Sequence, residues 1–435
     1  MRVRRNRFTA GAVVVAAALV AAGCGAGASS SSTGLSPTGN PIVIGISLPL
    51  TGGFSADGIA FDQGYKLWQT EINSSGGLLG RPVKLIILND NSDPNVTQTQ
   101  YRTLITADHV DLTLGPFSSL LTIPAEAAVA PYGYAMIEGA GTADTVFGSA
   151  ANLKYHNVIS PSLPVRSYMN PLVAWIKSLP ASQRPKTAAY PSVADPFALP
   201  AVQNAQSQLS KLGITTVYPV NQGFNEATTN NQDVAYYQGK AQAVARANPQ
   251  LVVLGSTDVG TVAEFMTVFQ KAGFKPEYFV ATSGPDQGNA FISFPGVGPG
   301  NADGMMVPGG WSGTYSNADS YSMVEQYISR YGGTAAGVNA DVAEAFSVGE
   351  VAADAVKATG GTDNAKILAY LHSGVTLQTV QGAAQFDTFG HNISPAQAAF
   401  MFQWQSTGHA FNQVLPVGIA GTVAGGPIVK PAWGS

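Results

Sequence analysis

Serine and threonine residues follow two predicted strands at positions where a ligand carboxylate could be held. Ser118 and Ser119 come directly after a run from Val110 to Gly115, and Thr142 follows a run that ends at Ile137. At such strand ends, helix N-termini offer unpaired N–H groups and the positive end of the helix dipole. Hydroxyl and amide groups there can bind a carboxylate. Plain helix capping is the alternative, since Ser and Thr favour N-cap positions.

Enzyme active sites find little support in the same sequence. No Gly-x-Ser-x-Gly turn is present to carry a nucleophile, and the five histidines form no pair at i, i+3 or i, i+4 for zinc. Gly139-Ala140-Gly141 follows a strand, but Asp144 replaces the third glycine of a dinucleotide-binding fingerprint, and no phosphate-binding P-loop occurs. We therefore expect no enzyme activity, no cofactor and no bound metal.

The elements that must position these residues follow an α/β pattern. From Pro41 onward, short β-branched runs alternate with amphipathic segments, which is typical of parallel sheets flanked by helices. Phe61, Tyr65, Trp68 and Ile72 recur at helical spacing. Strands are predicted at 42–46, 83–88, 110–115, 134–137, 187–191, 251–254, 278–281 and 305–307. In such open sheets, ligands bind beyond the carboxyl ends of the strands.

Length and composition favour a lobed globular protein. A chain of 435 residues is expected to form two or three packing units. Its 45% hydrophobic residues can fill real cores, while its 11% charged residues lie far below the roughly 25% of an average domain. Loss of an N-terminal segment with Arg2, Arg4, Arg5 and Arg7 would take the formal net charge from −4 to −8. Nucleic acid is therefore not an expected partner.

The N-terminus carries an export signal. Arginines are followed by an uncharged run from Ala10 to Ala22, too short for a transmembrane helix, so residues 1–23 are predicted to be a signal peptide. The segment Val20 to Cys24 resembles a bacterial lipobox, with Ala21 where leucine is usual, and Cys24 is the sole cysteine. We expect an exported protein that is lipid-anchored to the outer face of the cell membrane through Cys24.

Two segments that flank the folded part are rich in small residues. The segment 24–40 contains mostly Gly, Ala, Ser, Thr and Pro, a composition typical of a flexible tether. The segment 416–435 is rich in Gly and Pro and is predicted to be a loose C-terminal tail.

Dense motifs at both ends of the folded part resemble one family. They are Ile44-Gly45-Ile46, Thr51-Gly52-Gly53, Glu71-Ile72-Asn73-Ser74-Ser75-Gly76-Gly77, Leu79-Gly80-Arg81-Pro82-Val83, Asp90 with Asp93-Pro94, Gln381-Gly382-Ala383-Ala384-Gln385-Phe386-Asp387-Thr388-Phe389-Gly390-His391, and Phe402-Gln403-Trp404. These segments resemble the branched-chain amino-acid-binding proteins of bacterial ABC importers, which have the type I periplasmic binding-protein fold.

The resemblance implies two doubly wound lobes with parallel sheets, joined by three crossovers near Ser160, Val307 and Gly390. Lobe 1 would comprise 41–160 and 308–390, and lobe 2 would comprise 161–307 and 391–415. A solute would bind in the cleft, and the lobes would close about a hinge. The implied partners are an amino acid or similar small polar solute and an ABC-transporter permease, and a monomer is expected.

Several ligand-binding residues are carried over by position. Ser119, Ala140 and Thr142 match family positions that hold the α-carboxylate and α-amino group of an amino acid, and Ser118 and Gly141 adjoin them. Phe197 matches an aromatic residue that covers the ligand from the second lobe, with an ordinary core role as its alternative. Trp311 is placed either in the pocket wall or in the core.

Other positions depart from the family pattern. Asp57 stands where amino-acid binders carry an aromatic residue, and Ser283 stands where an acid pairs with the ligand ammonium. The remaining departures are Asp286, Thr257 with Asp258 in place of an aromatic pair, and Asp341. A buried ammonium needs a partner charge, which Asp57, Asp286 or Asp341 could supply, or the ligand lacks an ammonium. Each aspartate taken singly is expected to be a solvated loop carboxylate.

Three functions remain at this stage. The first is a solute-binding lipoprotein that feeds an importer without covalent chemistry. The second is a sensory module that binds solute without transport. The third is an extracellular amide or peptide hydrolase, which the missing nucleophile turn disfavours. The identity of the solute stays open.

Overall fold

The computed structural model describes residues 36–434 except 221–223, 225–233, 315–316 and 396–397. The predicted signal peptide, Cys24 and residues 25–35 of the predicted tether lie outside the described residues. Within the described part of the chain, no helix is both long and apolar enough to cross a membrane.

The first sheet has five parallel strands in the order β2-β1-β3-β4-β5. Their bounds are β1 (Ile42–Leu48), β2 (Val83–Asn89), β3 (Leu112–Leu114), β4 (Met136–Ile137) and β5 (Val158–Ile159). Central β1 pairs with β2 on one side and β3 on the other, so that Ile44 lies opposite both Leu85 and Leu112. The carboxyl ends of these strands therefore meet at one edge, where Ser118 and Ala140 follow β3 and β4.

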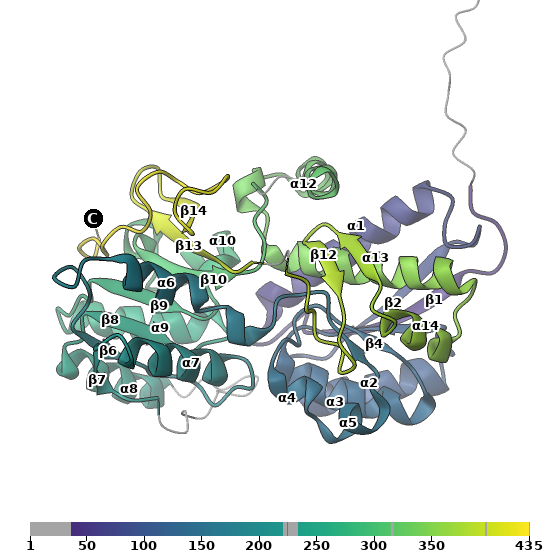
Figure 1. Ribbon diagram of the computed structural model, residues 1–435, viewed down its shortest axis with the longest axis horizontal. Coiled ribbons are helices and arrows are strands. Elements are labelled where there is room, and N and C mark those ends of the chain that lie inside the picture. The colour runs from purple at the N-terminus through teal and green to yellow at the C-terminus, as the bar shows by residue number, and fades with distance from the viewer. Residues whose placement is uncertain (1–35, 221–223, 225–233, 315–316, 396–397, 435) are drawn as a thin grey trace, which may run out of the picture. The chain divides into compact units, whose positions relative to one another are not determined.

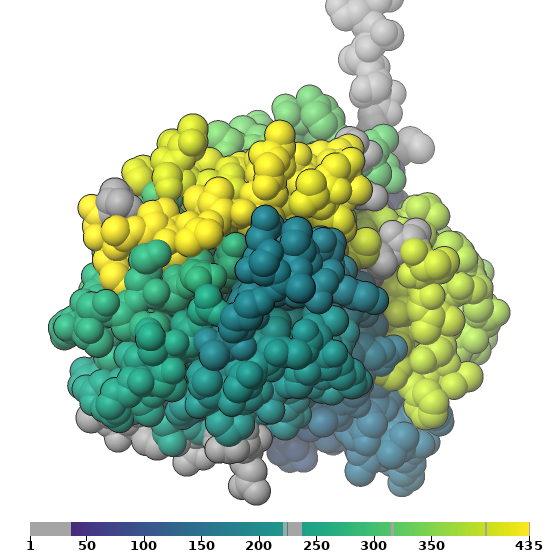
Figure 2. Space-filling model, turned by 60° about the vertical axis from the view of Figure 1, so that its left-hand side comes forward, coloured from purple at the N-terminus to yellow at the C-terminus, as the bar shows by residue number. Residues whose placement is uncertain are grey.

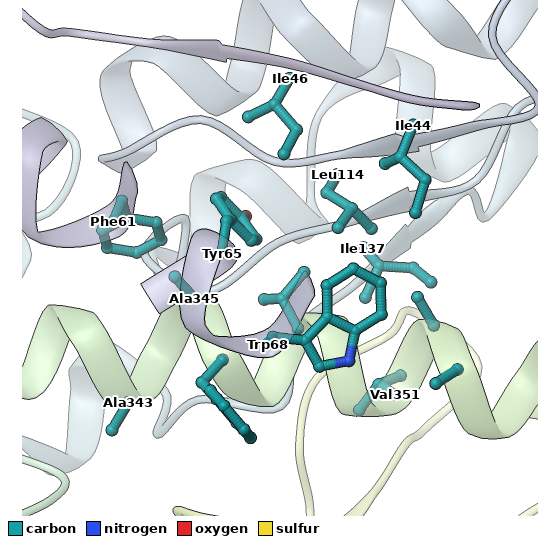
Figure 3. Close-up of a cluster of buried hydrophobic side chains, with 14 of the residues drawn as sticks. Ile44, Ile46, Phe61, Tyr65, Trp68, Leu114, Ile137, Ala343, Ala345 and Val351 are labelled. Carbon is teal, nitrogen blue, oxygen red and sulfur yellow. The ribbon is translucent and has the colours of Figure 1, made fainter. Parts of the chain in front are cut away.

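Helices cover both faces of the first sheet (Figure 1). On one face lie α1 (Ser55–Ser74) and α13 (Ala340–Thr359), and on the other lie α2 (Pro94–Thr106) and α3 (Ser119–Val129). Figure 3 shows the core on the first face, where Ile44 and Ile46 of β1 meet Trp68 of α1. The predicted apolar stripe of α1 is thus the core-facing side of that helix.

Helices α1 and α13 approach each other closely because glycines lie at their contact. A Cβ atom on Gly64 would lie 2.3 Å from the carbonyl oxygen of Val342, and one on Gly349 would lie 2.2 Å from Cδ2 of Trp68. This contact fixes the N-terminal ends of both helices, which carry Asp57 and Asp341.

The second sheet has seven strands in the order β14-β13-β10-β9-β8-β6-β7. Their bounds are β6 (Thr187–Ala189), β7 (Thr215–Tyr218), β8 (Leu251–Leu254), β9 (Tyr278–Ala281), β10 (Met305–Gly309), β13 (Phe400–Gln405) and β14 (Ala410–Leu415). The strands from β7 to β10 are parallel, as expected, but β13 and β14 are antiparallel additions at one edge. A short connection of Gln405 to Ala410 permits this hairpin, whereas parallel strands need a long crossover.

Side chains of β8 alternate between two cores of the second sheet. Leu251 and Val253 belong to the cluster that includes α6 (Asn170–Ser178) and α7 (Ala198–Ser210). Val252 and Leu254 belong to the cluster that includes α8 (Val234–Ala247) and α9 (Val259–Lys271). Burial on both faces explains the uninterrupted apolar run of this strand.

The remaining elements complete the described fold. They are α4 (Asp144–Phe147), α5 (Ala150–Tyr155), α10 (Asn289–Ile292), α11 (Pro299–Ala302), α12 (Ala318–Tyr331), α14 (Asn364–Leu371), β11 (Thr376–Thr379), β12 (Gly382–Gln385) and the 3-10 turns η1 (Ala130–Tyr132), η2 (Val165–Ser167), η3 (Pro285–Gln287) and η4 (Ala335–Gly337). Strands β11 and β12 pair as a separate antiparallel hairpin.

The chain passes between the two sheets three times, after β5, after β10 and before β13. Two of these passages are hydrogen-bonded to each other: Ser160 N donates to Gly390 O at 3.0 Å, and Asn392 Nδ2 donates to Pro161 O at 2.6 Å. Gly390 has a φ of +90°, and a Cβ there would lie 1.8 Å from the oxygen of Val158. Only glycine fits this crossing.

The C-terminal segment is not the loose tail that its composition predicts. Lys430 is fully buried, and its Nζ donates to Asp303 O at 2.7 Å and Asn301 O at 3.0 Å. Trp433 Nε1 donates to Phe274 O at 2.8 Å. Figure 2 shows this segment, in yellow, lying over the green segments of the second sheet. The segment lacks helix and strand, as predicted, but side-chain contacts hold it in place.

Candidate ligand-binding site

A pocket of ≈ 430 Å³ is lined by residues that follow strands of both sheets. Residues from the first-sheet side include Ser118, Ala140 and Asp341, and residues from the second-sheet side include Thr257 and Asp286. Nine of the residues singled out from the sequence line it: Asp57, Ser118, Ala140, Phe197, Thr257, Ser283, Asp286, Trp311 and Asp341. Ser119, Gly141, Thr142 and Asp258 are not among the lining residues.

Ser118 combines the two roles considered for it. It is the N-cap of α3, its hydroxyl accepts a bond from Leu121 N at 3.4 Å, and it also lines the pocket. Its φ of 75° is rare for a residue with a side chain, and such conformations cluster at functional sites. Ser119 is the first residue of α3, and its buried hydroxyl accepts from Ala143 N at 3.2 Å. Ser119 therefore ties two strand-end loops together.

Gly141 and Thr142 lie behind the pocket wall. The N–H of Gly141 donates to the buried carboxylate of Glu138, and the carbonyl of Thr142 accepts from Val165 N at 3.1 Å. The capping role considered for Thr142 is not found, because α4 begins at Asp144 with Ala143 as its N-cap.

Asp258 is explained by local structure. As the N-cap of α9, its carboxylate accepts from Thr261 N at 2.7 Å and Thr261 Oγ1 at 2.6 Å. Its neighbour Thr257 lines the pocket.

Aromatic side chains form much of the pocket wall. Phe197 lines the pocket and meets Tyr168 edge to face, with 5.4 Å between ring centroids. Trp311 lines the pocket and also belongs to the first-sheet core, where its Nε1 donates to Ser320 Oγ at 3.0 Å and Val380 O at 3.1 Å. The two roles weighed for Trp311 therefore coexist.

The expectation of solvated loop aspartates is wrong for the three that line the pocket. Asp57 is 2% exposed in the first turn of α1, and Asp341 is 7% exposed in the first turn of α13. Asp286 lines the pocket from η3, and its carboxylate accepts from Gly284 N at 2.7 Å. Helix α13 brings Asp341 next to Asp57 because the two helices pack through glycine.

Gln287 links these carboxylates. Its Nε2 donates to Asp57 Oδ1 and to Asp341 Oδ2, the latter at 3.4 Å, while its Oε1 accepts from Asn339 Nδ2 at 2.8 Å. One amide from the second-sheet side thus bridges two acids of the first-sheet side.

Burial dominates the electrostatics of the pocket. It raises the pKa of Asp286 to about 6 and that of nearby Glu138 to about 7. Burial, reinforced by the charge of Asp341, raises the pKa of both Asp57 and Glu344 well above the ordinary range. Burial, then the charge of Asp286, raises the pKa of Asp341, whereas its bond to Asp57 lowers it.

Sequence reasoning missed two residues that line the pocket, Glu344 and Tyr168, and it missed Gln287, which does not line the pocket but bonds to Asp57 and Asp341. Glu344 lies three residues after Asp341 on α13, a spacing that places both on one helix face. That spacing was a usable signal. The 3-10 turn that carries Gln287 and the short segment that carries Tyr168 offer no comparable periodicity.

Among the described residues, no group of three or more His, Cys, Asp or Glu is arranged to hold a metal ion. The arrangement offers hydrogen-bond acceptors, aromatic surface and negative charge, which are means of recognising a solute.

Two α/β lobes with mainly parallel sheets, joined by three passages and with a pocket lined from both, define a two-lobed ligand-binding protein of the type I periplasmic class. Residues 41–409 match the model of a family described as periplasmic binding protein. The chain belongs to the periplasmic binding protein family, and the resemblance predicted from its motifs is confirmed.

Curated relatives match a limited part of the chain. The "Leu/Ile/Val-binding protein homolog 1" of Brucella abortus (strain 2308) is 31% identical over 101 residues, which is 23% of this chain and 27% of that protein. The "Leu/Ile/Val-binding protein BraC3" of Rhizobium johnstonii is 31% identical over 102 residues, which is 23% of this chain and 28% of that protein. These alignments span little more than a quarter of either relative.

Solved structures share the whole fold. The leucine binding protein LivK of Thermotoga maritima has a TM-score of 0.71 at 17% identity, covering 86% of this chain and 97% of that one. LivJ of Streptococcus pneumoniae, in complex with isoleucine, has a TM-score of 0.67 at 16% identity, covering 90% and 100%. A solute-binding protein of R. palustris, in complex with benzoate, has a TM-score of 0.69 at 17% identity, covering 91% and 99%.

Proposed function

We propose that this chain is an exported lipoprotein that captures an amino acid or related small polar solute and delivers it to an ABC importer. The observation that carries the proposal is the pocket lined by buried polar groups from both lobes. Binding of solute there would lock the lobes together, and the closed form would be what a permease recognises. The protein would act by binding alone, without covalent chemistry.

The site residues belong to the same proposal. Ser118 and Ala140 would contact the solute from the first-sheet side, and Phe197, Thr257 and Ser283 would contact it from the second. Ser119, Gly141 and Thr142 would act by holding the loops beneath it. Lobes of 41–160 with 308–390, and of 161–307 with 391–415, are the proposed moving bodies.

Relatives suggest the range of solutes to test first. Proteins of the same fold are named as complexes with isoleucine, leucine, benzoate or 4-hydroxybenzoate. Amino acids and aromatic acids are therefore the first two classes to test, starting with whatever small molecule native mass spectrometry detects bound to the purified protein.

Phe197→Ala is expected to weaken binding of that solute at least tenfold, because it removes an aromatic wall of the pocket. A saturating solute at about 100 times Kd should stabilise the protein by roughly 2.7 kcal/mol, which thermal unfolding measures. Phe294→Ala is the matched control, since Phe294 is 37% exposed and does not line the pocket. Equal affinity in both variants would place the binding site elsewhere.

Cys24→Ser is expected to release the protein from the membrane into the soluble extracellular fraction, because the thiol that would carry the lipid is lost. Cell fractionation and immunoblotting measure the distribution, and metabolic labelling with a fatty acid should mark the original protein alone. Retention of the serine variant on the membrane, together with an unlabelled original protein, would refute the anchor.

A further inference from the structure

The ionisable side chains that line the pocket are almost all acidic. Four carboxyl side chains line it: Asp57, Asp286, Asp341 and Glu344. Among the described residues, no lysine or arginine lines it, and its one histidine, His409, is half-exposed and bonded through Nδ1 to Asp303 Oδ2 at 2.8 Å. A solute that carries a carboxylate would enter this pocket against negative charge with no opposing cation.

Glu344 is the acid whose bonding is least complete. It is 6% exposed and lines the pocket, yet its carboxyl group makes no hydrogen bond with any other residue in the described part of the chain. By contrast, Asp57 and Asp341 bond to Gln287, and Asp286 bonds to Gly284. The Glu344 oxygens are not among the fully enclosed side-chain atoms that lack a partner, so they face the open space of the pocket, where a solute could bond to them.

The remaining acids narrow the chemistry of that partner. Burial and neighbouring carboxylates raise the pKa of both Asp57 and Asp341, which favours fewer than two negative charges on this pair, and Asp286 and Glu344 add charge when they are ionised. A single ammonium beside a single carboxylate, as in a neutral amino acid, leaves this charge uncompensated. A net positive solute compensates it.

Aromatic side chains in the pocket wall provide a surface for the uncharged part of the solute. Phe117, Tyr168, Phe197, Trp311 and Trp404 all line the pocket. Aliphatic chains pack well on such surfaces, and aromatic faces also attract cations. Carboxylates that lack a donor favour N–H groups over a quaternary nitrogen, which cannot donate.

We propose that the solute is an organic amine of net positive charge, whose primary ammonium or guanidinium group donates to Glu344 and Asp286 and whose aliphatic part lies against the aromatic wall. The inference rests on the proposed function of this pocket and names its class of solute. It separates this chain from binders of anionic aromatic acids and of neutral amino acids.

Isothermal titration and thermal unfolding of the full chain, freed of bound solute by unfolding and refolding, test the proposal at pH 7.5. The cationic probes are putrescine, cadaverine, agmatine and lysine, and the comparison probes are leucine, 4-hydroxybenzoate, choline and Ca²⁺. At least one of the four cationic amines is expected to bind with a Kd at least a hundredfold lower than any comparison probe.

Glu344→Gln is expected to weaken binding of that amine at least tenfold, since it removes the charge and keeps the shape. Glu350→Gln is the matched control on the same helix, because Glu350 lies outside the pocket and accepts from Val380 N at 2.8 Å, a bond that glutamine retains. The control is expected to stay within twofold of the original protein.

Each of the other possible results of these measurements refutes a stated part of the proposal. Tighter binding of leucine or 4-hydroxybenzoate than of every amine refutes the cationic solute and leaves the capture function standing. Tighter binding of choline or Ca²⁺ than of every amine refutes the claim that the solute donates N–H bonds to the carboxylates. Amine binding that Glu344→Gln leaves unchanged refutes the role of Glu344. If none of the probes binds and native mass spectrometry detects no bound molecule, the proposed capture function itself is refuted.

Discussion

Gly349→Ala is expected to lower the free energy of unfolding by about 3 kcal/mol, at the upper end of what overpacking a core costs. A Cβ there would lie 2.2 Å from Cδ2 and 2.4 Å from Cγ of Trp68, which is itself 2% exposed. Neither the indole nor helix α13 can move without opening the core of the first sheet. Urea unfolding followed by tryptophan fluorescence measures the loss.

Two further variants test whether the loss of stability in Gly349→Ala comes from the collision with Trp68. Gly239→Ala changes an exposed glycine in α8 with nothing within 4 Å of the new methyl group, so it should stabilise the protein by about 0.4–1 kcal/mol. Trp68→Leu should reduce the penalty of Gly349→Ala when the two are combined, because the colliding ring is gone. Additive effects of Trp68→Leu and Gly349→Ala would contradict the packing account.

The ligand-free protein is expected to lose stability as the pH rises from about 4 to about 7. Half-buried Asp286 and fully buried Glu138, with pKa values raised to about 6 and about 7, hold protons in the folded state that the unfolded chain releases near pH 4. The folded state thus binds more protons in this window, and the free energy of unfolding falls with pH, by a few kcal/mol in all. Asp57, Asp341 and Glu344 act in the same direction.

Asp286→Asn isolates one contribution to this pH dependence. Asparagine stays neutral and can still accept from Gly284 N, so the variant should be more stable than the original protein at pH 8 and gain nothing at pH 4. Asp108→Asn, an exposed position, is the control and should gain nothing at either pH. Chemical unfolding at both pH values measures the differences, and a gain at pH 4 equal to that at pH 8 would refute the titration argument.

The fold was largely predictable because a strand that is buried on both faces of a sheet appears in the sequence as an uninterrupted apolar run. Strands 251–254 and 278–281 coincide with the structure, since each is an apolar run bounded by polar or turn residues. Strands 112–114 and 136–137 are shorter than predicted, because Val110 and Tyr134 are apolar for reasons of core packing outside the ladder. The antiparallel edge formed by β13 and β14 depends on strand pairing, which periodicity does not reveal.

The pocket was predictable where a strand end, as before Ser118, or a family position marked it. Asp57 and Asp341 were identified by their family positions, but each was expected to be a solvated carboxylate. No local sequence pattern indicates that an aspartate is buried in a polar pocket. Glu344 lies within an apolar helix and was passed over. The packing of the C-terminal segment was likewise hidden, because single side chains such as Lys430 find partners more than a hundred residues away.

The late position of α13 in the chain has a consequence for folding kinetics. The first sheet ends at Ile159, but the helix that covers its inner face begins only at Ala340, and contacts such as Tyr327 Oη with Gln63 Oε1 join residues 264 positions apart. Such high contact order slows folding, and α1 alone covers this face of the sheet until most of the chain is available. For an exported protein, such slow folding would keep the polypeptide competent for translocation for longer.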